Sequence, residues 1–326
     1  MGITNLGRKE YLKLDQVICR SKRTHEQSPF GYRRIDVTSH ASDIFRICSP
    51  FLCGPVPLYG DYTARNVENA YQFAKVYREH VDANGDPTPA YFEWAQNGWS
   101  SAAAQRRPFG HRAPLYSLWD GDKLDLVQSR RRIYLPLYSR AVVKSEGFQE
   151  LRRLYQVGDQ LCLIDYDAYD YETLGYQTAD DIVDDAGRTL GHCFALKFLL
   201  EGWIPMPQPF RVIIAGGRDF ADYKQLKSFA DRMLAGKRAQ GIEVVCGDAN
   251  GADKLGERYA AEHAFDIRHF PAQWDVLGRR AGYVRNVQMG DYADALIAFW
   301  DGQSHGTRHM IEYMKKLNKP IRICNY

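Results

Sequence analysis

The sequence of 326 residues has no Cys-x-x-Cys pair, although it contains seven cysteines. They are scattered along the chain, at positions 19, 48, 53, 162, 193, 246 and 324. An odd number of cysteines without regular spacing argues against a disulfide framework and against a zinc knuckle. Reduced thiols in a cytosol are the simplest interpretation, so we expect a cytoplasmic protein.

Long apolar runs and an excess of one charge are also lacking. No run approaches the ~18 apolar residues of a membrane span, and the start of the chain lacks the apolar stretch of a signal peptide. Lysine and arginine total 43 against 40 aspartate and glutamate residues, which gives a net charge of +3. We therefore expect no membrane partner, whereas this charge balance neither requires nor excludes nucleic acid.

The overall amino-acid composition is that of a globular protein, and the chain is long enough for two domains. The clearest division is the segment EGWIPMPQPFR, residues 201–211. Pro205, Pro207 and Pro209 stand at alternate positions, which favours a short, stiff, extended connector. We predict an N-terminal extension over residues 1–28, a first domain over 29–204, a linker over 205–209 and a second domain over 210–326.

The second domain has the rhythm of a doubly wound α/β fold. Short, almost continuously apolar segments are typical of strands buried on both faces; they begin at residues 210, 242, 266, 295 and 319. Between them lie helical patterns over residues 221–236, 252–264, 283–291 and 306–317. This alternation predicts a Rossmann-like parallel sheet with helices on both faces, in which ligands bind at the carboxyl ends of the strands.

Glycine-rich turns follow three of these strands, at residues 216–219, 247–253 and 304–307. Glycine lets the backbone approach a ligand closely, and a helix N-terminus offers free N–H groups to a phosphate. One such turn is weak support, because glycine-rich turns are common for structural reasons. Three turns at one sheet edge predict a nucleotide or sugar-phosphate pocket.

The segments RVIIAGGRDF, CGDANGAD, AGYVRN and SHGT resemble the YspA-like branch of the SLOG superfamily. The resemblance implies a Rossmann-like domain that binds nucleotides or ADP-ribose-type ligands. It also implies which residues line the ligand site: Gly216, Gly217, Arg218, Gly251, Asp253, Arg285, Asn286, Gly306 and Thr307. Phosphoribohydrolases of this superfamily carry a glutamate where this chain has Met310, which favours binding or sensing in this half. His305 and His309 could form half of a metal site, but no third ligand is evident, so we expect no metal and no cofactor.

The first domain contains the segment NVENAYQFAK, residues 66–75. In a helix, an apolar stripe would begin at Val67, and a polar stripe beside it would join Glu68 to Lys75 through Tyr71 and Gln72. Two interpretations remain open for this carboxylate and amine. They form either a solvated edge of an ordinary helix or the acid–base wall of a pocket.

With residues 45–53, 126–142, 160–176 and 187–202, this segment resembles the NADAR (YbiA-like) family over about residues 40–202. The resemblance implies a mainly helical domain that hydrolyses N-glycosidic bonds of ribosylated or ADP-ribosylated substrates. It makes Glu68 and Lys75 the main catalytic candidates, with Tyr71 beside them. In the acidic, tyrosine-rich stretch 165–172, Asp167 is the candidate for a second carboxylate, although an edge strand with one solvated face explains the same pattern.

The leading hypothesis is therefore an N-glycosidase that acts on an ADP-ribosyl or ribosyl–base linkage, followed by a nucleotide-binding domain. A non-catalytic sensor of an NAD-derived nucleotide is one alternative, and a nucleotide phosphoribohydrolase that uses the second domain is another. The expected partner is a nucleotide or an ADP-ribose-type ligand. A nucleic acid that carries the modification and a homo-oligomeric state are both left open.

Overall fold

The computed structural model describes residues 15–24 and 28–326. The chain divides into two compact units, and both are discontinuous in sequence. One contains the described residues up to Ser49 together with Val142–Met206, and the other contains Pro50–Ala141 and Pro207–Tyr326. This division differs from the predicted one, in which a linker over residues 205–209 separates two continuous domains, because the chain also crosses between the units at residues 49–50 and 141–142.

The first unit is built on a parallel sheet of three strands in the order β1-β8-β2. These strands are β1 (Val17–Ser21), β8 (Leu161–Asp165) and β2 (Arg33–Asp36). Every residue of β1 and β8 is buried. The buried residues include the polar side chains of Arg20, Ser21 and Asp165 at the ends of the two strands. Part of the predicted extension over residues 1–28 thus belongs to a sheet, and its residues 1–14 and 25–27 lie outside the described residues.

Helices complete this unit. The apolar helix α7 (His192–Glu201) packs on β1 and β8, and α5 (Glu146–Gln156) packs on η1 (Ile44–Cys48) and α7. The shorter elements are η4 (Glu172–Leu174) and α6 (Ala179–Asp184). The first half of the chain is therefore less purely helical than we predicted, because a buried parallel sheet forms part of its core.

Residues 50–141 form short strands and helices. The two-stranded sheet pairs β3 (Val56–Pro57) with β4 (Thr63–Ala64). The three-stranded antiparallel sheet contains β5 (Lys75–Val76), β6 (Tyr116–Trp119) and β7 (Asp122–Leu124). The helices are α1 (Val67–Gln72), η2 (Arg78–His80), α2 (Pro89–Ser100), α3 (Leu126–Ser129), the π-helical turn η3 (Arg130–Tyr134) and α4 (Leu135–Val142).

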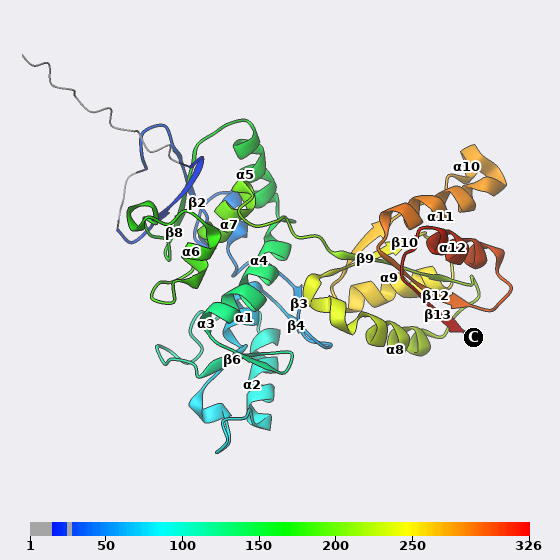
Figure 1. The fold of residues 1–326 in the computed structure, drawn as a ribbon, viewed down its shortest axis with the longest axis horizontal. Coiled ribbons are helices and arrows are strands. Elements are labelled where there is room, and N and C mark those ends of the chain that lie inside the picture. Colours follow the sequence, from blue (N-terminus) through cyan, green and yellow to red (C-terminus); the bar gives the residue numbers. More distant parts are fainter. Residues whose placement is uncertain (1–14, 25–27) are drawn as a thin grey trace, which may run out of the picture. The chain divides into compact units, whose positions relative to one another are not determined.

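Residues 210–326 form the predicted parallel sheet, with five strands in the order β11-β10-β9-β12-β13. Figure 1 labels β9, β10, β12 and β13 of this sheet. The strands are β9 (Phe210–Gly216), β10 (Ile242–Cys246), β11 (Asp266–His269), β12 (Ala295–Trp300) and β13 (Ile321–Asn325). The connecting helices are α8 (Tyr223–Leu234), η5 (Ala235–Gln240), α9 (Ala252–Glu262), α10 (Trp274–Leu277), η6 (Gly278–Arg280), α11 (Ala281–Tyr292) and α12 (His305–Lys316).

Successive residues of the strands pack on opposite faces of this sheet. Val212 and Ile214 join a core cluster with residues of α8 and α9, whereas Ile213 joins one with residues of α11 and α12. The period-two alternation of a strand thus buries both faces under helices, and the domain is Rossmann-like as predicted. Within the described residues, no helix is long and apolar enough to cross a bilayer.

Candidate functional site

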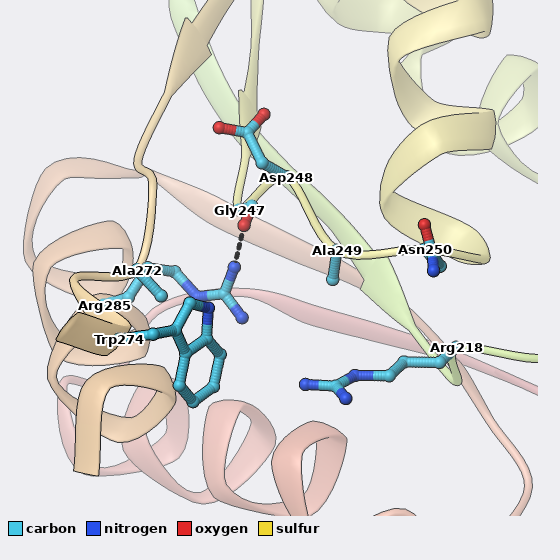
Figure 2. Close-up of a pocket in the computed structure, with 8 residues that line it drawn as sticks. All are labelled: Arg218, Gly247, Asp248, Ala249, Asn250, Ala272, Trp274 and Arg285. Carbon is cyan, nitrogen blue, oxygen red and sulfur yellow. Dashed lines mark hydrogen bonds between the residues drawn. The ribbon is translucent and has the colours of Figure 1, made fainter. Parts of the chain in front are cut away.

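A cavity of about 410 Å³ lies at the carboxyl edge of the five-stranded sheet. It is lined by the turns after β9, β10 and β12 and by residues of α10 and α11. A second pocket of about 380 Å³ shares several of these residues with it, among them Arg218, Trp274 and Arg285 (Figure 2). The three glycine-rich turns identified in the sequence therefore meet around one space.

The cavity brings together nearly all of the residues expected to line the ligand site. Gly216, Gly217, Arg218, Asp253, Arg285, Asn286, Gly306 and Thr307 line it, and Gly251 does not. Gly251 has φ +76°, and a Cβ there would lie 2.2 Å from the carbonyl oxygen of Gly217. Only glycine fits this contact, so Gly251 fixes the turn behind the cavity instead of lining it.

Three arginines bring positive charge to the cavity, namely Arg218, Arg279 and Arg285. Figure 2 shows the Arg218 and Arg285 side chains extending into the pocket from different sides. Arg285 donates a hydrogen bond from Nη1 to the carbonyl oxygen of Gly247, which holds its guanidinium at the turn after β10. Arg218 is exposed, and it has no hydrogen-bond or ion-pair partner among residues 15–24 and 28–326. Arg218 is thus free to pair with an incoming anion.

Asp253 supplies a buried carboxyl group beside the arginine. Its Oδ2 accepts a hydrogen bond of 3.1 Å from the backbone N–H of Gly247 and lies 4.0 Å from Nη1 of Arg285. Burial raises the pKa of Asp253 to about 6, against the opposing attraction of Arg285. The Asp253 carboxyl is therefore largely ionised at neutral pH, at a cost in stability.

The N-terminus of α12 forms another wall of the cavity. Ser304 caps this helix, because its Oγ accepts hydrogen bonds from the backbone N–H and from the hydroxyl of Thr307. The first intrahelical bond runs from the N–H of Arg308 to the carbonyl of Ser304, so the N–H groups of His305 and Gly306 precede it. These groups and the helix dipole favour an anion at this position.

A chain of hydrogen bonds ties α11 to α12 across the cavity. Nε of Arg285 donates to Oδ1 of Asn286 at 3.1 Å, and Nδ2 of Asn286 donates to the carbonyl of Gly306 at 3.0 Å. Asn286 is buried and lines the cavity. It therefore fixes the position of the α12 N-terminus relative to the Arg285 guanidinium.

Sequence reasoning missed two aromatic side chains that line the cavity. Trp274 begins α10 and is 49% exposed, and Tyr283 in α11 is 47% exposed. Exposed rings beside an anion-binding turn are suited to stack on a planar base. The signal was available, because Trp274 follows β11 at the ligand-binding edge of the sheet, as the three predicted turns follow their strands.

The residues of the NVENAYQFAK segment form a second polar group, in residues 50–141. Helix α1 ends at Gln72, so Lys75 does not lie on the helix as we predicted but in β5, where it pairs with Ser117 of β6. The predicted polar connection from Glu68 to Lys75 is nevertheless present. Nε2 of Gln72 donates to Oε1 of Glu68 at 3.0 Å, and Nζ of Lys75 donates to Oε1 of Gln72 at 2.7 Å.

Burial changes the chemistry of this group. Glu68 and Gln72 are buried and Lys75 is partly buried. Burial lowers the pKa of Lys75 to about 8, with Arg107 and Arg130 contributing and Glu68 opposing. Burial also raises the pKa of Tyr71, whose hydroxyl lies 3.3 Å from Oγ of Ser129. This is not a solvated helix edge, because Glu68 and Gln72 are buried and Lys75 is partly buried.

Asn69 is a positioning residue that sequence reasoning did not select. It is fully buried, and its Nδ2 donates to the carbonyls of Ser101 and Ala103 at 3.0 Å each. Its Oδ1 accepts a hydrogen bond from the N–H of Gln105 at 2.8 Å. Asn69 thus binds the loop that precedes the Arg107 guanidinium to helix α1.

Asp167 belongs to the first unit. It is partly buried after β8, and its Oδ1 lies 3.5 Å from Nη2 of the exposed Arg23. Asp165, two residues earlier, makes the more buried contact, 3.0 Å from Nδ1 of His192. Burial alone would raise the pKa of Asp165, but His192 and hydrogen bonds from backbone N–H groups lower it to about 2. The Asp165 carboxylate is therefore held by His192 and by the backbone.

The sheet order, the glycine-rich turns and the arginine-lined cavity define a Rossmann-like domain of the nucleotide-binding class. A family model described as "YspA, cpYpsA-related SLOG family" matches residues 210–276. The Gene 61 protein of Mycobacterium phage D29 is 33% identical over 118 residues, which cover 34% of this chain and 93% of the phage protein. The C-terminal part of the chain belongs to the YspA, cpYpsA-related SLOG family.

The first half of the chain is similar to a different family. Residues 20–177 match the model of a family of unknown function, DUF6939, rather than the NADAR family that the sequence resembled. No solved structure matches the chain. The NADAR resemblance, and the catalytic roles that it implies, therefore stay predictions.

The pKa of Asp253 predicts how stability depends on pH. A folded-state pKa of about 6 against 3.8 unfolded means that the folded protein holds this proton more tightly. The stabilisation that this proton gives to the folded protein is complete below pH 3.8 and is lost as the pH rises through 6. The free energy of unfolding changes by about 3 kcal/mol over this range. We expect Asp253→Asn to raise the free energy of unfolding at pH 8 by up to that amount and to have little effect near pH 4. Urea denaturation at both pH values would test this; equal destabilisation at both would contradict it.

Proposed function

We propose that the C-terminal domain binds a nucleotide or an ADP-ribose-type ligand in the 410 Å³ cavity. The phosphates would lie between Arg218, Arg285 and the N-terminus of α12, and the base would stack on Trp274 or Tyr283. The observation that carries the proposal is the convergence of three arginines, Arg218, Arg279 and Arg285, with a capped helix N-terminus. Each favours an anion, and together they specify a phosphate.

Arg218 offers the most direct test. Replacing Arg218 with alanine removes an exposed, unpaired guanidinium and should leave the fold intact. Loss of one charge-assisted hydrogen bond weakens binding by about 1.5–3 kcal/mol, which is roughly 10- to 100-fold. Calorimetric titration with ADP-ribose would measure this change. Arg232→Ala, an exposed arginine on α8, is the matched control and should bind normally. If both variants bind ADP-ribose like the wild type, the proposed site is wrong.

Gly306 tests the close approach of the ligand to the α12 N-terminus. A Cβ at this position meets no protein atom within 4 Å, so the cavity itself can accept alanine. Because alanine is the better helix former, Gly306→Ala should keep or raise the melting temperature, while a methyl group in the path of the phosphate weakens binding. The expected result is unchanged or higher stability with at least about tenfold weaker ADP-ribose binding. Unchanged binding would place the phosphate elsewhere.

We also propose that residues 50–141 carry an N-glycosidase site, because Glu68, Gln72 and Lys75 form a hydrogen-bonded relay with a depressed amine pKa. When the bond between ribose C1 and a base nitrogen breaks, the electron pair leaves with the base and positive charge develops on the sugar. The Glu68 carboxylate can stabilise that charge and accept a proton from the attacking water. Lys75 can then hold a substrate oxygen or protonate the departing base.

Glu68→Gln tests this second proposal. The change keeps an oxygen for the Gln72 amide to donate to, but it removes the charge and the basic group. Loss of general-base catalysis lowers turnover by roughly 100-fold or more. The assay incubates the full chain with NAD, ADP-ribose and ADP-ribosylated guanosine and follows released base by chromatography. Glu93→Gln, at an exposed position on α2, is the control.

The three hypotheses, an N-glycosidase in residues 50–141, a hydrolase in the C-terminal domain and a non-catalytic sensor, predict different outcomes in this assay. Activity lost in Glu68→Gln but retained in Arg218→Ala supports hydrolysis in residues 50–141. The reverse pattern assigns hydrolysis to the C-terminal domain. Tight binding with every ligand recovered intact favours a non-catalytic nucleotide sensor and contradicts the glycosidase proposal.

A further inference from the structure

Four side chains of three chemical types meet beside the turn after β10. Cys246 ends β10, Asp248 follows it in the turn, Glu257 lies on α9, and His269 ends β11. The ligand atoms of all four, one thiol sulfur, two carboxylate oxygens and one imidazole nitrogen, lie within 4.8 Å of one another. We propose that these residues form a binding site for a divalent transition-metal ion of the zinc type.

The distances within the cluster fit a small tetrahedral ion. Sγ of Cys246 lies 3.1 Å from Oε1 of Glu257 and 3.8 Å from Oδ1 of Asp248, and Nδ1 of His269 lies 2.6 Å from the same Asp248 oxygen. Around a zinc ion with bonds of about 2.0–2.3 Å, neighbouring ligand atoms stand roughly 3.3–3.7 Å apart. The three distances, 2.6, 3.1 and 3.8 Å, lie on either side of that spacing.

The set of ligands selects the class of metal. Zinc accepts sulfur, nitrogen and carboxylate oxygen together, whereas calcium and magnesium take oxygen ligands almost exclusively. One thiol among four ligands therefore favours Zn²⁺ or Co²⁺ over the alkaline-earth ions. On binding, the Cys246 thiol gives up its proton to solvent and the thiolate forms the metal–sulfur bond, while His269 binds as neutral imidazole.

Two features of the fold hold the cluster in place. Asp248 has φ +58°, an uncommon conformation for a residue other than glycine, and its N–H lies 3.3 Å from Sγ of Cys246. β10 and β11 are adjacent parallel strands, and Cys246 is in register with His269. The sheet thus fixes the thiol and the imidazole on neighbouring strand ends. Folding therefore brings these two ligands together before the metal binds.

Lys254 competes with a metal for Glu257. Its Nζ lies 2.8 and 3.0 Å from the two carboxylate oxygens of Glu257, so metal binding must draw one oxygen away from this ion pair. Removing the amine should therefore strengthen metal binding. Lys254 is exposed, so Lys254→Ala carries little risk to the fold.

Co²⁺ is the probe for the test, because thiolate bound to Co²⁺ gives a charge-transfer absorption that oxygen and nitrogen ligands do not. We expect the full chain to bind one Co²⁺ with this band and Zn²⁺ to displace it. His269→Ala, an exposed ligand, should weaken binding by about tenfold or more while the fold persists. Cys246→Ser should abolish the band, and Lys254→Ala should strengthen binding by a measurable factor.

Cys324→Ser is the matched control, because Cys324 is a partly buried cysteine on β13 outside the cluster. It should keep both the band and the affinity. Absence of stoichiometric binding, or a band that survives in Cys246→Ser and vanishes in Cys324→Ser, would overturn the proposal. The test needs no nucleotide, so its outcome is separate from that of the cavity experiments.

Discussion

The candidate ligand site depends on one close backbone contact between the first two turns of the sheet. The N–H of Ala252 donates to the carbonyl of Gly217 at 3.2 Å, and Gly251 stands so near that carbonyl that a side chain could not fit. This contact joins the turn that carries Arg218 to the start of the helix that carries Asp253. Without it, the arginine and the buried carboxyl would belong to independent loops. With it, they face one cavity whose dimensions the sheet sets.

The strands of the C-terminal domain could be predicted to within two residues or so at most of their ends, and the reason is physical. A strand buried on both faces must be apolar throughout, and glycine or polar residues end it. Elsewhere the local signal was overridden by pairing with distant segments. Lys75 continues the helical spacing of residues 67–74, yet its backbone pairs with Ser117, about 40 residues away, and the helix stops at Gln72. Likewise β1 gives no sign of being a strand until β8 is known to lie beside it.

The two polar sites of the C-terminal domain show the same contrast between what local sequence predicts and what depends on distant segments. Convergence of the three turns follows from the rule that parallel strands end at one edge, so the cavity could be predicted before any coordinates were known. The pairing of Asp253 with Arg285 could not, because it depends on which strands are neighbours. The Cys246–His269 contact depends on the same sheet order, and its two residues are 23 positions apart with no motif spacing. The expectation of no metal was made without this information, and it stays a prediction.

One seven-residue turn, Gly247 to Asp253, serves both polar clusters of the C-terminal domain. Its first carbonyl accepts a hydrogen bond from the Arg285 guanidinium (Figure 2), and its last side chain, that of Asp253, lines the cavity. Oδ1 of Asp248, between them, lies 2.6 Å from Nδ1 of His269. An ion bound by Asp248 would restrict the backbone that positions Arg285, and a phosphate bound by Arg285 would restrict Asp248 in turn. Linkage requires any such effect to be reciprocal. A metal in this position would therefore act on ligand affinity through a short, identifiable segment of backbone rather than by contact with the ligand.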